Sequence, residues 1–338
     1  MNNQLKIRSR TCAAALCLLA TAAVAEGEVR LLSFEGYADD AWRVPFEEAS
    51  GCQVTVSYAG GVDEMFAKMA GSDGSDFDLV SIDTSLFPRY AEAGLIQAYD
   101  DAKIPNLANL LDAFQNVDAV MDGASRFGIP VAWGSQGLIY DADEMSDAPT
   151  SWAAMWDPEN AQRVIALDDS NNNIVMAALL LEFEDPYTLS EEQMAQVKDK
   201  LIELKGNLLS YYTGFDEGVA VWESGAATMM FSMGEPQIGQ LRERGYNAVY
   251  SIPEEGAVGW LDTWALSVGA EDLDCAHAWV NYVLQPEVGA ALNEKFGYGP
   301  TTVEAAGMEY ADNLVWLKPV EDMDARVRLW NEIKAAVQ

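Results

Sequence analysis

Between residues 29 and 93, segments with a strand pattern alternate three times with segments of helical spacing. The strand pattern covers Val29–Phe34, Cys52–Tyr58 and Phe77–Asp83, and the helical spacing covers Asp39–Ala49, Val62–Met69 and Leu86–Ala93. Strands that alternate with short helices are typical of βαβ units, in which the strands run parallel and helices cover both faces of the sheet. The sequence therefore predicts an α/β fold with mostly parallel sheets.

In sheets of this kind, ligands bind beyond the carboxyl ends of the strands. Aromatic and polar residues stand at or just after two of these ends: Phe34 and Tyr37 follow the first strand, and Asp83 and Ser85 follow the third. We expect these four side chains to contribute to a ligand site.

A second set of α/β elements lies between two long extended segments. Residues 128–140 and 256–266 are apolar and contain several glycines, and each is typical of a strand that crosses between two lobes. Two lobes joined by more than one crossover predict a hinged clamshell that closes on a small molecule. We expect residues 26–132 and 259–310 to form lobe 1, residues 133–258 to form lobe 2, and residues 311–338 to form a helical segment that packs across both lobes.

The second crossover contains Trp260 and Asp262 two residues apart. In a strand, residues at this spacing point to the same face, so an aromatic plane and a carboxylate would lie side by side. Such a pair suits a ligand with a positively charged nitrogen. The structural alternative is a core tryptophan beside an aspartate that caps the end of a strand.

Residues 1–25 have the pattern of a cleavable export signal. Lys6, Arg8 and Arg10 precede an apolar run at Cys12–Val24, and Ala25 ends a small-residue cleavage site. The run is too short to span a bilayer. We expect a soluble protein of 313 residues, exported into a bacterial periplasm.

The chain is strongly acidic, with a formal net charge of −34. Removal of the export signal would lower the net charge to −37, because the signal carries three basic and no acidic residues. Such a field repels nucleic acid and anionic lipid and attracts cations. Solubility in a saline habitat explains the same composition, so the charge sets the partners only weakly.

Cys52 and Cys275 remain after cleavage, and an oxidising compartment permits a disulfide between them. The sequence leaves this pairing open. His277 is the only histidine, which argues against a histidine-based catalytic triad or a zinc site. We expect no catalytic residues, no metal and no cofactor.

Several motifs resemble those of the periplasmic spermidine/putrescine-binding proteins that supply ABC importers, in the same order and at similar spacing over nearly the whole exported chain. They are Phe77–Val80, Ile129–Gly134, Trp152–Trp156, Leu167–Asp169, Gly259–Asp262 and Phe296–Tyr298. The resemblance implies the two-lobed type II periplasmic-binding-protein fold, with the ligand held in the cleft between the lobes.

Members of this family hold polyamines with aromatic side chains around the methylene chain and with carboxylates at the amine ends. By motif, Trp260 and Asp262 match a family aromatic residue and the carboxylate that holds one amine. Tyr37, Asp169 and Tyr298 match further contacts. The resemblance therefore implies a ligand site that contains these five residues.

The chain also departs from the family pattern at the site. Phe34 stands where a tryptophan is usual, Asp83 and Ser85 replace a serine and a tyrosine, Asn172 replaces an acidic residue, and Ser232 replaces a tryptophan. With Asp262 near one end and Asp83 or Asp169 near the other, a diamine fits. With a polar second end at Asn172 and Ser232, a zwitterion or a betaine-type osmolyte fits as well.

The function that the sequence favours is a non-enzymatic, monomeric receptor that passes a small cationic amine to the membrane permease of an ABC importer. A receptor that presents its ligand to a chemosensor would share every one of these features. A secreted hydrolase with paired carboxylates is the competing class, but nothing in the sequence marks a catalytic acid.

Overall fold

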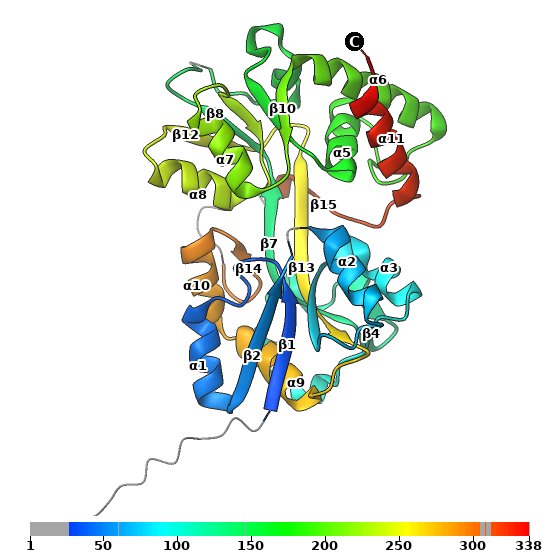
Figure 1. Cartoon of the computed structure of the whole chain (residues 1–338), viewed down its shortest axis with the longest axis vertical. Helices are drawn as coiled ribbons and strands as arrows, with labels where there is room; N and C mark the ends of the chain where they lie inside the picture. Colours follow the sequence, from blue (N-terminus) through cyan, green and yellow to red (C-terminus); the bar gives the residue numbers. More distant parts are fainter. Residues whose placement is uncertain (1–26, 60, 146, 305–307, 309–311, 338) are drawn as a thin grey trace, which may run out of the picture.

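The computed structural model shows two lobes, each built around one β-sheet (Figure 1). The structure describes residues 27–59, 61–145, 147–304, 308 and 312–337, so the predicted export signal lies outside the described residues. Among the helices in these ranges, none has the length and apolarity needed to cross a membrane.

The first lobe contains an eight-stranded sheet whose main path runs β14–β7–β13–β3–β1–β2, with β4 and β15 also paired to β13. Its elements are β1 (Gly27–Ser33), α1 (Asp40–Ser50), β2 (Cys52–Tyr58), α2 (Val62–Gly71), β3 (Leu79–Asp83), α3 (Phe87–Glu92), β4 (Ile96–Gln97), α4 (Asp112–Gln115), β7 (Gly128–Gln136), β13 (Ala257–Ser267), α9 (Leu273–Val283), α10 (Pro286–Phe296), β14 (Gly299–Pro300) and β15 (Leu314–Trp316). The short strands β5 (Met121–Asp122) and β6 (Ser125–Arg126) form a separate pair.

Helices cover both faces of this sheet because successive residues of β1 point to opposite sides. Leu31 belongs to a core with Phe46 of α1 and Trp279 of α9. Leu32 belongs to a second core with Met69 of α2 and Tyr90 of α3. All of these side chains are almost completely buried, so β1 forms the centre of the lobe.

The second lobe contains a five-stranded sheet in the order β10–β9–β11–β8–β12. Its elements are β8 (Leu138–Asp141), β9 (Val164–Leu167), α5 (Ser170–Leu180), α6 (Glu191–Asn207), β10 (Leu208–Tyr212), α7 (Phe215–Glu223), β11 (Met229–Phe231), α8 (Glu235–Glu243), β12 (Ala248–Ser251) and α11 (Met323–Ala335). Helices α5, α6 and α11 lie together on one side, and α7 and α8 lie on the other (Figure 1).

The strands of the βαβ units are parallel, as the sequence predicted, but both sheets are mixed. β1 runs parallel to β2 and β3, and β9 runs parallel to β10 and β11. The crossover strand β13 is antiparallel to β3 and β7, and β8 is antiparallel to β11 and β12. The sheets therefore contain more antiparallel pairing than the predicted mostly parallel arrangement. The reason is that β8 and β13, which follow the two crossovers, enter their sheets in the reverse direction.

The predicted crossovers are present, although the first lies later in the chain than expected. β7 stays in the first sheet to Gln136, and β8 begins in the second sheet at Leu138, so the chain changes lobe at Gly137 and not after Ala132. Gly137 is required there, because a Cβ at this position would lie 2.6 Å from the carbonyl oxygen of Ser251. The return falls between β12 and β13 (Figure 1).

The C-terminal segment reaches both lobes, but its helix packs on one of them. β15 pairs with β13 at the hinge. α11 packs on α5 and α6, where Glu332 pairs with Lys198 and the indole nitrogen of Trp330 donates to Asp168. We expected the helical segment to pack across both lobes, and instead α11 is part of the second lobe.

Cys52 and Cys275 form a disulfide, which settles the pairing that the sequence left open. The bond joins the start of β2 to α9 across a separation of 223 residues. It therefore fixes the returning chain to the first lobe, away from the cleft.

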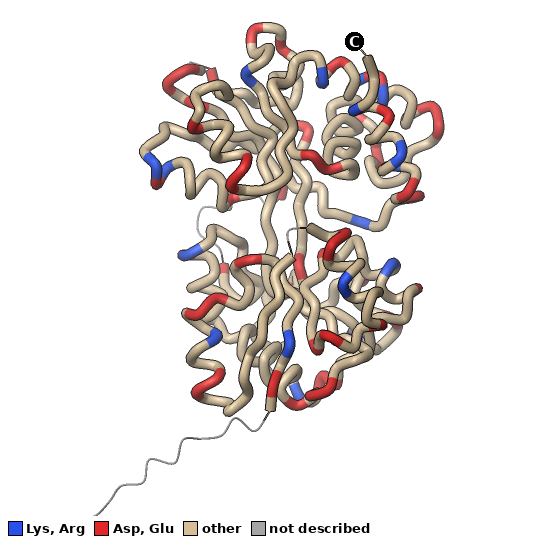
Figure 2. Tube along the Cα trace, in the orientation of Figure 1, with Lys and Arg blue, Asp and Glu red and all other residues tan. Residues whose placement is uncertain are grey.

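The sequence contains 54 acidic and 20 basic residues, and the acidic positions are spread along the traces of both lobes (Figure 2). The acidity is therefore a property of the whole surface and does not mark one docking patch.

Candidate functional site

Two aspartates lie side by side where β3 and β13 pair. Asp83 ends β3, and its Cα partner on the antiparallel strand β13 is Asp262. Both side chains are buried, at 6% and 7% exposure. In the described part of the chain, neither carboxylate forms an ion pair with a basic side chain. The pair therefore consists of two buried carboxyl groups with no basic partner among the described residues.

The hydrogen bonds around the pair orient each carboxylate. The Tyr37 hydroxyl donates to Asp262 Oδ2 at 2.5 Å. Asp83 Oδ1 accepts from the backbone N–H and the hydroxyl of Ser85 at 2.8 and 2.5 Å. The backbone N–H of Leu261 points at Asp83 Oδ2 at 3.4 Å. These bonds fix the carboxylates in place but do not neutralise them.

Burial raises the pKa of Asp262 to about 8, and the neighbouring charge of Asp83 adds to this rise, while the hydrogen bond from Tyr37 opposes it. Burial also raises the pKa of Asp83 above its usual value, against the hydrogen bonds from Ser85. Two adjacent buried carboxylates cannot both ionise cheaply, so near neutral pH the pair holds a proton or requires a cation.

Aromatic side chains surround this end of the site. Tyr37 lies 5.7 Å from Tyr298 and 6.5 Å from Phe34, measured between ring centroids. Trp260 lies edge-on to Tyr298 at 5.4 Å. The rings come from the turn after β1, from β13 and from Tyr298, two residues after the end of α10. Together they form an aromatic wall beside the carboxylate pair, which suits an alkylammonium group.

Residues 41–314 match the family of bacterial extracellular solute-binding proteins. The chain belongs to this family. Families of this kind comprise substrate-binding transport proteins, not enzymes, and they imply a small-molecule ligand and a membrane permease as partners for the solute-binding protein.

Two relatives and one solved structure extend this result. The spermidine/putrescine-binding periplasmic protein 1 of Haemophilus influenzae is 28% identical over 295 residues, covering 84% of this chain and 78% of the relative. The putrescine-binding periplasmic protein PotF of Escherichia coli is 26% identical over 287 residues, covering 79% and 76%. The spermidine/putrescine ABC transporter substrate-binding protein PotD of Streptococcus pneumoniae has a TM-score of 0.77 at 19% identity, covering 91% of this chain and 99% of that structure. The two-lobed, type II periplasmic-binding-protein fold predicted from the sequence is thereby confirmed.

The second lobe of this solute-binding protein contributes Asp169 and Asn172 at the start of α5. Asp169 is the N-cap of the helix and accepts from the backbone N–H of Asn172 at 2.8 Å. Burial raises the pKa of Asp169, and the charge of Asp63 on the first lobe adds to the rise. Asn172 is buried, and its Oδ1 has no hydrogen-bond partner within the described part of the chain. The start of α5 therefore offers a carboxylate held by a backbone hydrogen bond and an amide oxygen that can still accept one.

Two predicted site residues occupy other places than expected. The sequence allowed Asp83 to hold the far end of a ligand, but its pairing with Asp262 puts it at the same end. Ser232 is fully buried, and its hydroxyl donates to the carbonyl of Gly137 at 3.0 Å. Ser232 therefore supports the hinge, and its hydroxyl is already engaged.

Glu235 is an acidic residue at the site that the sequence did not single out. It opens α8 in the second lobe, and its Oε1 accepts from the backbone N–H and hydroxyl of Ser135 in β7 at 3.0 and 2.7 Å. It is one of 54 acidic residues, and no local pattern separates it from the others. Only the packing of α8 against β7 and α10 identifies it.

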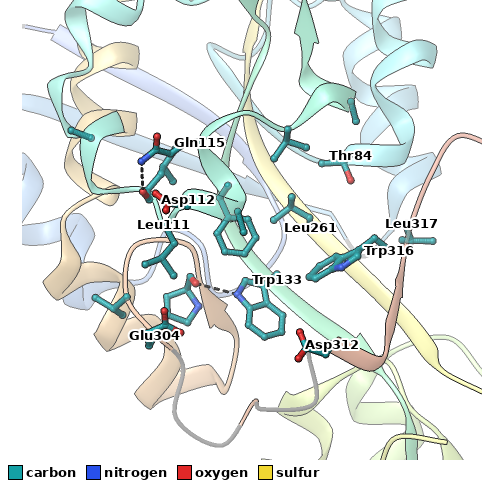
Figure 3. A pocket seen from close by; sticks show the side chains of 18 residues that line it. Thr84, Leu111, Asp112, Gln115, Trp133, Leu261, Glu304, Asp312, Trp316 and Leu317 are labelled. Carbon is teal, nitrogen blue, oxygen red and sulfur yellow. Dashed lines mark hydrogen bonds between the residues drawn. The ribbon is translucent and has the colours of Figure 1, made fainter. Parts of the chain in front are cut away.

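A separate cavity of about 900 Å³ lies on the opposite face of the hinge strands (Figure 3). Leu261 and Trp133, which are Cα partners on β13 and β7, line it together with Trp316. Side chains alternate along a strand, so Leu261 points away from the face that carries Trp260 and Asp262. None of the ten predicted site residues lines this cavity, so it is distinct from the aspartate pair.

Proposed function

We propose that this protein is the periplasmic receptor of an ABC importer and that it captures a polyamine of the putrescine or spermidine type in the cleft between its lobes. The observation that carries the proposal is the buried pair Asp83–Asp262, which has no basic partner among the described residues and lies beside Tyr37, Trp260 and Tyr298. A buried anion pair of this kind is stable only with a proton or a bound cation.

The hydrogen-bonding capacity of the pair favours a primary or secondary ammonium over a quaternary one. Carboxylates are acceptors, and a primary ammonium offers them three N–H donors. The aromatic wall alone would suit choline or a betaine equally well. Those ligands have no N–H group on the quaternary nitrogen, so they would leave Asp83 and Asp262 without donors. The names of the relatives, which refer to putrescine and spermidine, point to the same ligand class.

The second lobe supplies the contacts that closure would add. The unsatisfied Oδ1 of Asn172 suits an N–H donor of the ligand, and Asp169 adds negative charge beside it. A ligand that bridges the two lobes would shift the population toward the closed form. In this scheme the chain passes from lobe 1 to lobe 2 at Gly137, returns to lobe 1 at β13, and loses residues 1–25 on export. The receptor would act as a monomer.

Isothermal titration calorimetry tests the proposal with putrescine, spermidine, choline, glycine betaine and a set of amino acids. We expect the two polyamines to bind with micromolar or tighter affinity, and choline and betaine to bind at least about tenfold more weakly, a difference of about 1.4 kcal/mol. Tighter binding of choline or betaine would contradict the ligand class. Failure of every amine to bind would contradict the proposal as a whole.

A further inference from the structure

We propose that the cavity on the opposite face of the hinge strands is a second binding site, and that it takes a hydrophobic organic cation of the aromatic ammonium type. This is the cavity of about 900 Å³ that β7 and β13 separate from Asp262 (Figure 3). The proposal is independent of the ligand that binds at the aspartate pair. Two features carry it, which are the aromatic base of the cavity and the charge of its rim.

Two indole rings line the base of the cavity, and a glycine beside each ring leaves room for it. A Cβ placed on Gly299 would lie 2.1 Å from Trp133 Cε2, and a Cβ on Gly259 would lie 3.2 Å from Trp316 Cε3. The two ring centroids are 5.9 Å apart, and the ring planes meet at 64°. Trp133 and Trp316 therefore form an aromatic corner against the sheet.

The deeper ring of this aromatic corner is fixed in place. The indole nitrogen of Trp133 donates to the carbonyl of Pro300 at 3.1 Å. On the sheet, Trp133 lies between its Cα partners Leu261 of β13 and Gly299 of β14. Because its N–H group is already bonded, Trp133 presents ring surface to the cavity. A side chain that is already held loses little conformational freedom when a ligand binds.

Most of the cavity lining is apolar. Of the 18 lining residues, 13 are apolar, three are acidic and two are neutral and polar. One of the neutral pair, Gln115, already donates its side-chain N–H to the carbonyl of Leu110 at 3.0 Å. Cavities of this size and composition bind organic molecules mainly by removing apolar surface from water. The ligand therefore needs a hydrophobic group, and a polyol would find few hydrogen-bonding partners.

The charged residues of the lining are all acidic. They are the exposed Asp112, Glu304 and Asp312, and the last two lie on either side of Trp133 (Figure 3). The sequence between Glu304 and Asp312 contains no basic residue, and Lys318 does not line the cavity. A cation at the mouth is attracted by these carboxylates and by the indole faces, whereas an anion is repelled.

Titration of the full exported protein with three small probes, followed by NMR of the probe, tests the proposal. Benzyltrimethylammonium carries a ring and a charge, tetramethylammonium carries the charge alone, and 2-methyl-1-phenylpropan-2-ol carries the ring without charge. We expect the first probe to bind at least about fivefold more tightly than the other two, because only it uses both the aromatic corner and the acidic rim. No binding of the first probe, or equal binding of either other probe, would overturn the proposal.

Two variants locate the bound probe. Ala113→Trp fills the cavity from its exposed side and should weaken binding of benzyltrimethylammonium at least about tenfold. Glu304→Gln combined with Asp312→Asn alters only exposed side chains, and should weaken the cation about threefold while leaving the alcohol unchanged. The matched control, Glu92→Gln combined with Asp118→Asn, removes two exposed first-lobe charges outside the cavity and should change neither probe.

Asp262→Asn separates this cavity from the aspartate pair, where Tyr37, Trp260 and Tyr298 also offer ring surface to a quaternary ammonium. We expect benzyltrimethylammonium to bind this variant as tightly as it binds the unmodified protein. Loss of binding in Asp262→Asn, or full binding in Ala113→Trp, would place the probe elsewhere and overturn the assignment. If Ala113→Trp does not fold, an unchanged affinity in the Glu304→Gln, Asp312→Asn variant overturns it instead. No polyamine enters these measurements, so they stand or fall apart from the proposed function.

Discussion

The two lobes differ in how completely their candidate site residues are assembled. On the first lobe, Asp83, Asp262 and Tyr37 come from three distant segments and are held together by strand pairing and a 2.5 Å hydrogen bond. On the second lobe, Asp169 and Asn172 lie together at the start of one helix, and no described residue donates to the Oδ1 of Asn172. Under the proposed function, the first lobe would be preorganised for a cation, and the second lobe would gain its contacts when the ligand binds and the lobes close.

The largest expected effect follows from removal of the first-lobe anchor. Asp262→Ala should weaken polyamine binding by at least about 2 kcal/mol, because it leaves a buried ammonium without its main partner. Calorimetry measures the change, with Glu92→Ala, an exposed acidic residue of the same lobe, as control. If the affinity is unchanged, Asp262 is not in the site and the contrast between the lobes fails.

The stability of the ligand-free protein should depend on pH because Asp262 is buried. The pKa of Asp262 is raised to about 8 in the folded protein, so between about pH 4 and pH 8 the folded state holds a proton that the unfolded state releases. This group's contribution to stability is therefore largest below pH 4 and falls as the pH rises to 8.

Asp262→Asn removes that titration. Relative to the unmodified protein, the variant should gain roughly 1–3 kcal/mol of stability between pH 5 and pH 8, measured by urea unfolding without ligand. A difference between the two proteins that is independent of pH would contradict a raised pKa for this carboxyl group.

A smaller effect should follow from restoring the family serine at Asp83. Asp83→Ser removes one acceptor and should cost about 1 kcal/mol of polyamine affinity at pH 8. It also removes a charge that raises the pKa of Asp262. In the unmodified protein, affinity should rise from pH 6 to pH 8 as the ammonium displaces a proton, and in the variant this rise should occur at lower pH. Calorimetry in buffers of different ionisation enthalpy measures the released proton.

The smallest effect is expected on the second lobe. Asp169→Asn keeps an acceptor that can cap α5 and removes only charge, so it should weaken polyamine binding by about 0.5–1 kcal/mol with little loss of stability. A loss as large as that of Asp262→Ala would show that the second lobe anchors the ligand as firmly as the first.

Much of the fold could be predicted from local pattern. β2 has the bounds that the sequence predicted, and α1 and α2 begin within one residue of the predicted helices. Strand alternation and helix periodicity report burial directly, so such elements can be read without knowing their neighbours. β10 and α8 were missed, because β10 merges with the end of α6 and α8 is a short, largely polar helix.

The site was predicted in part for a related reason. Motif position predicted that Tyr37, Trp260, Asp262 and Tyr298 share one site, and the structure brings these side chains into contact with one another; their binding of a ligand stays a prediction. Motif position could not place Asp83. Whether this residue lies beside Asp262 or at the other end of the site depends on the register between strands almost 180 residues apart. Nor could it identify Glu235, since an acidic residue carries no local mark of what it packs against.

By itself, the sequence determined the βαβ segments of the first lobe, the presence of two crossovers and the spacing of Trp260 and Asp262, because each depends on residues that are close along the chain. Only the tertiary structure decided that Asp83 and Asp262 are adjacent, that Cys52 meets Cys275, that Ser232 supports Gly137 and that Glu235 lies beside Trp260. These contacts depend on strand register and lobe packing, which arise from the summed burial of many side chains and not from any one motif.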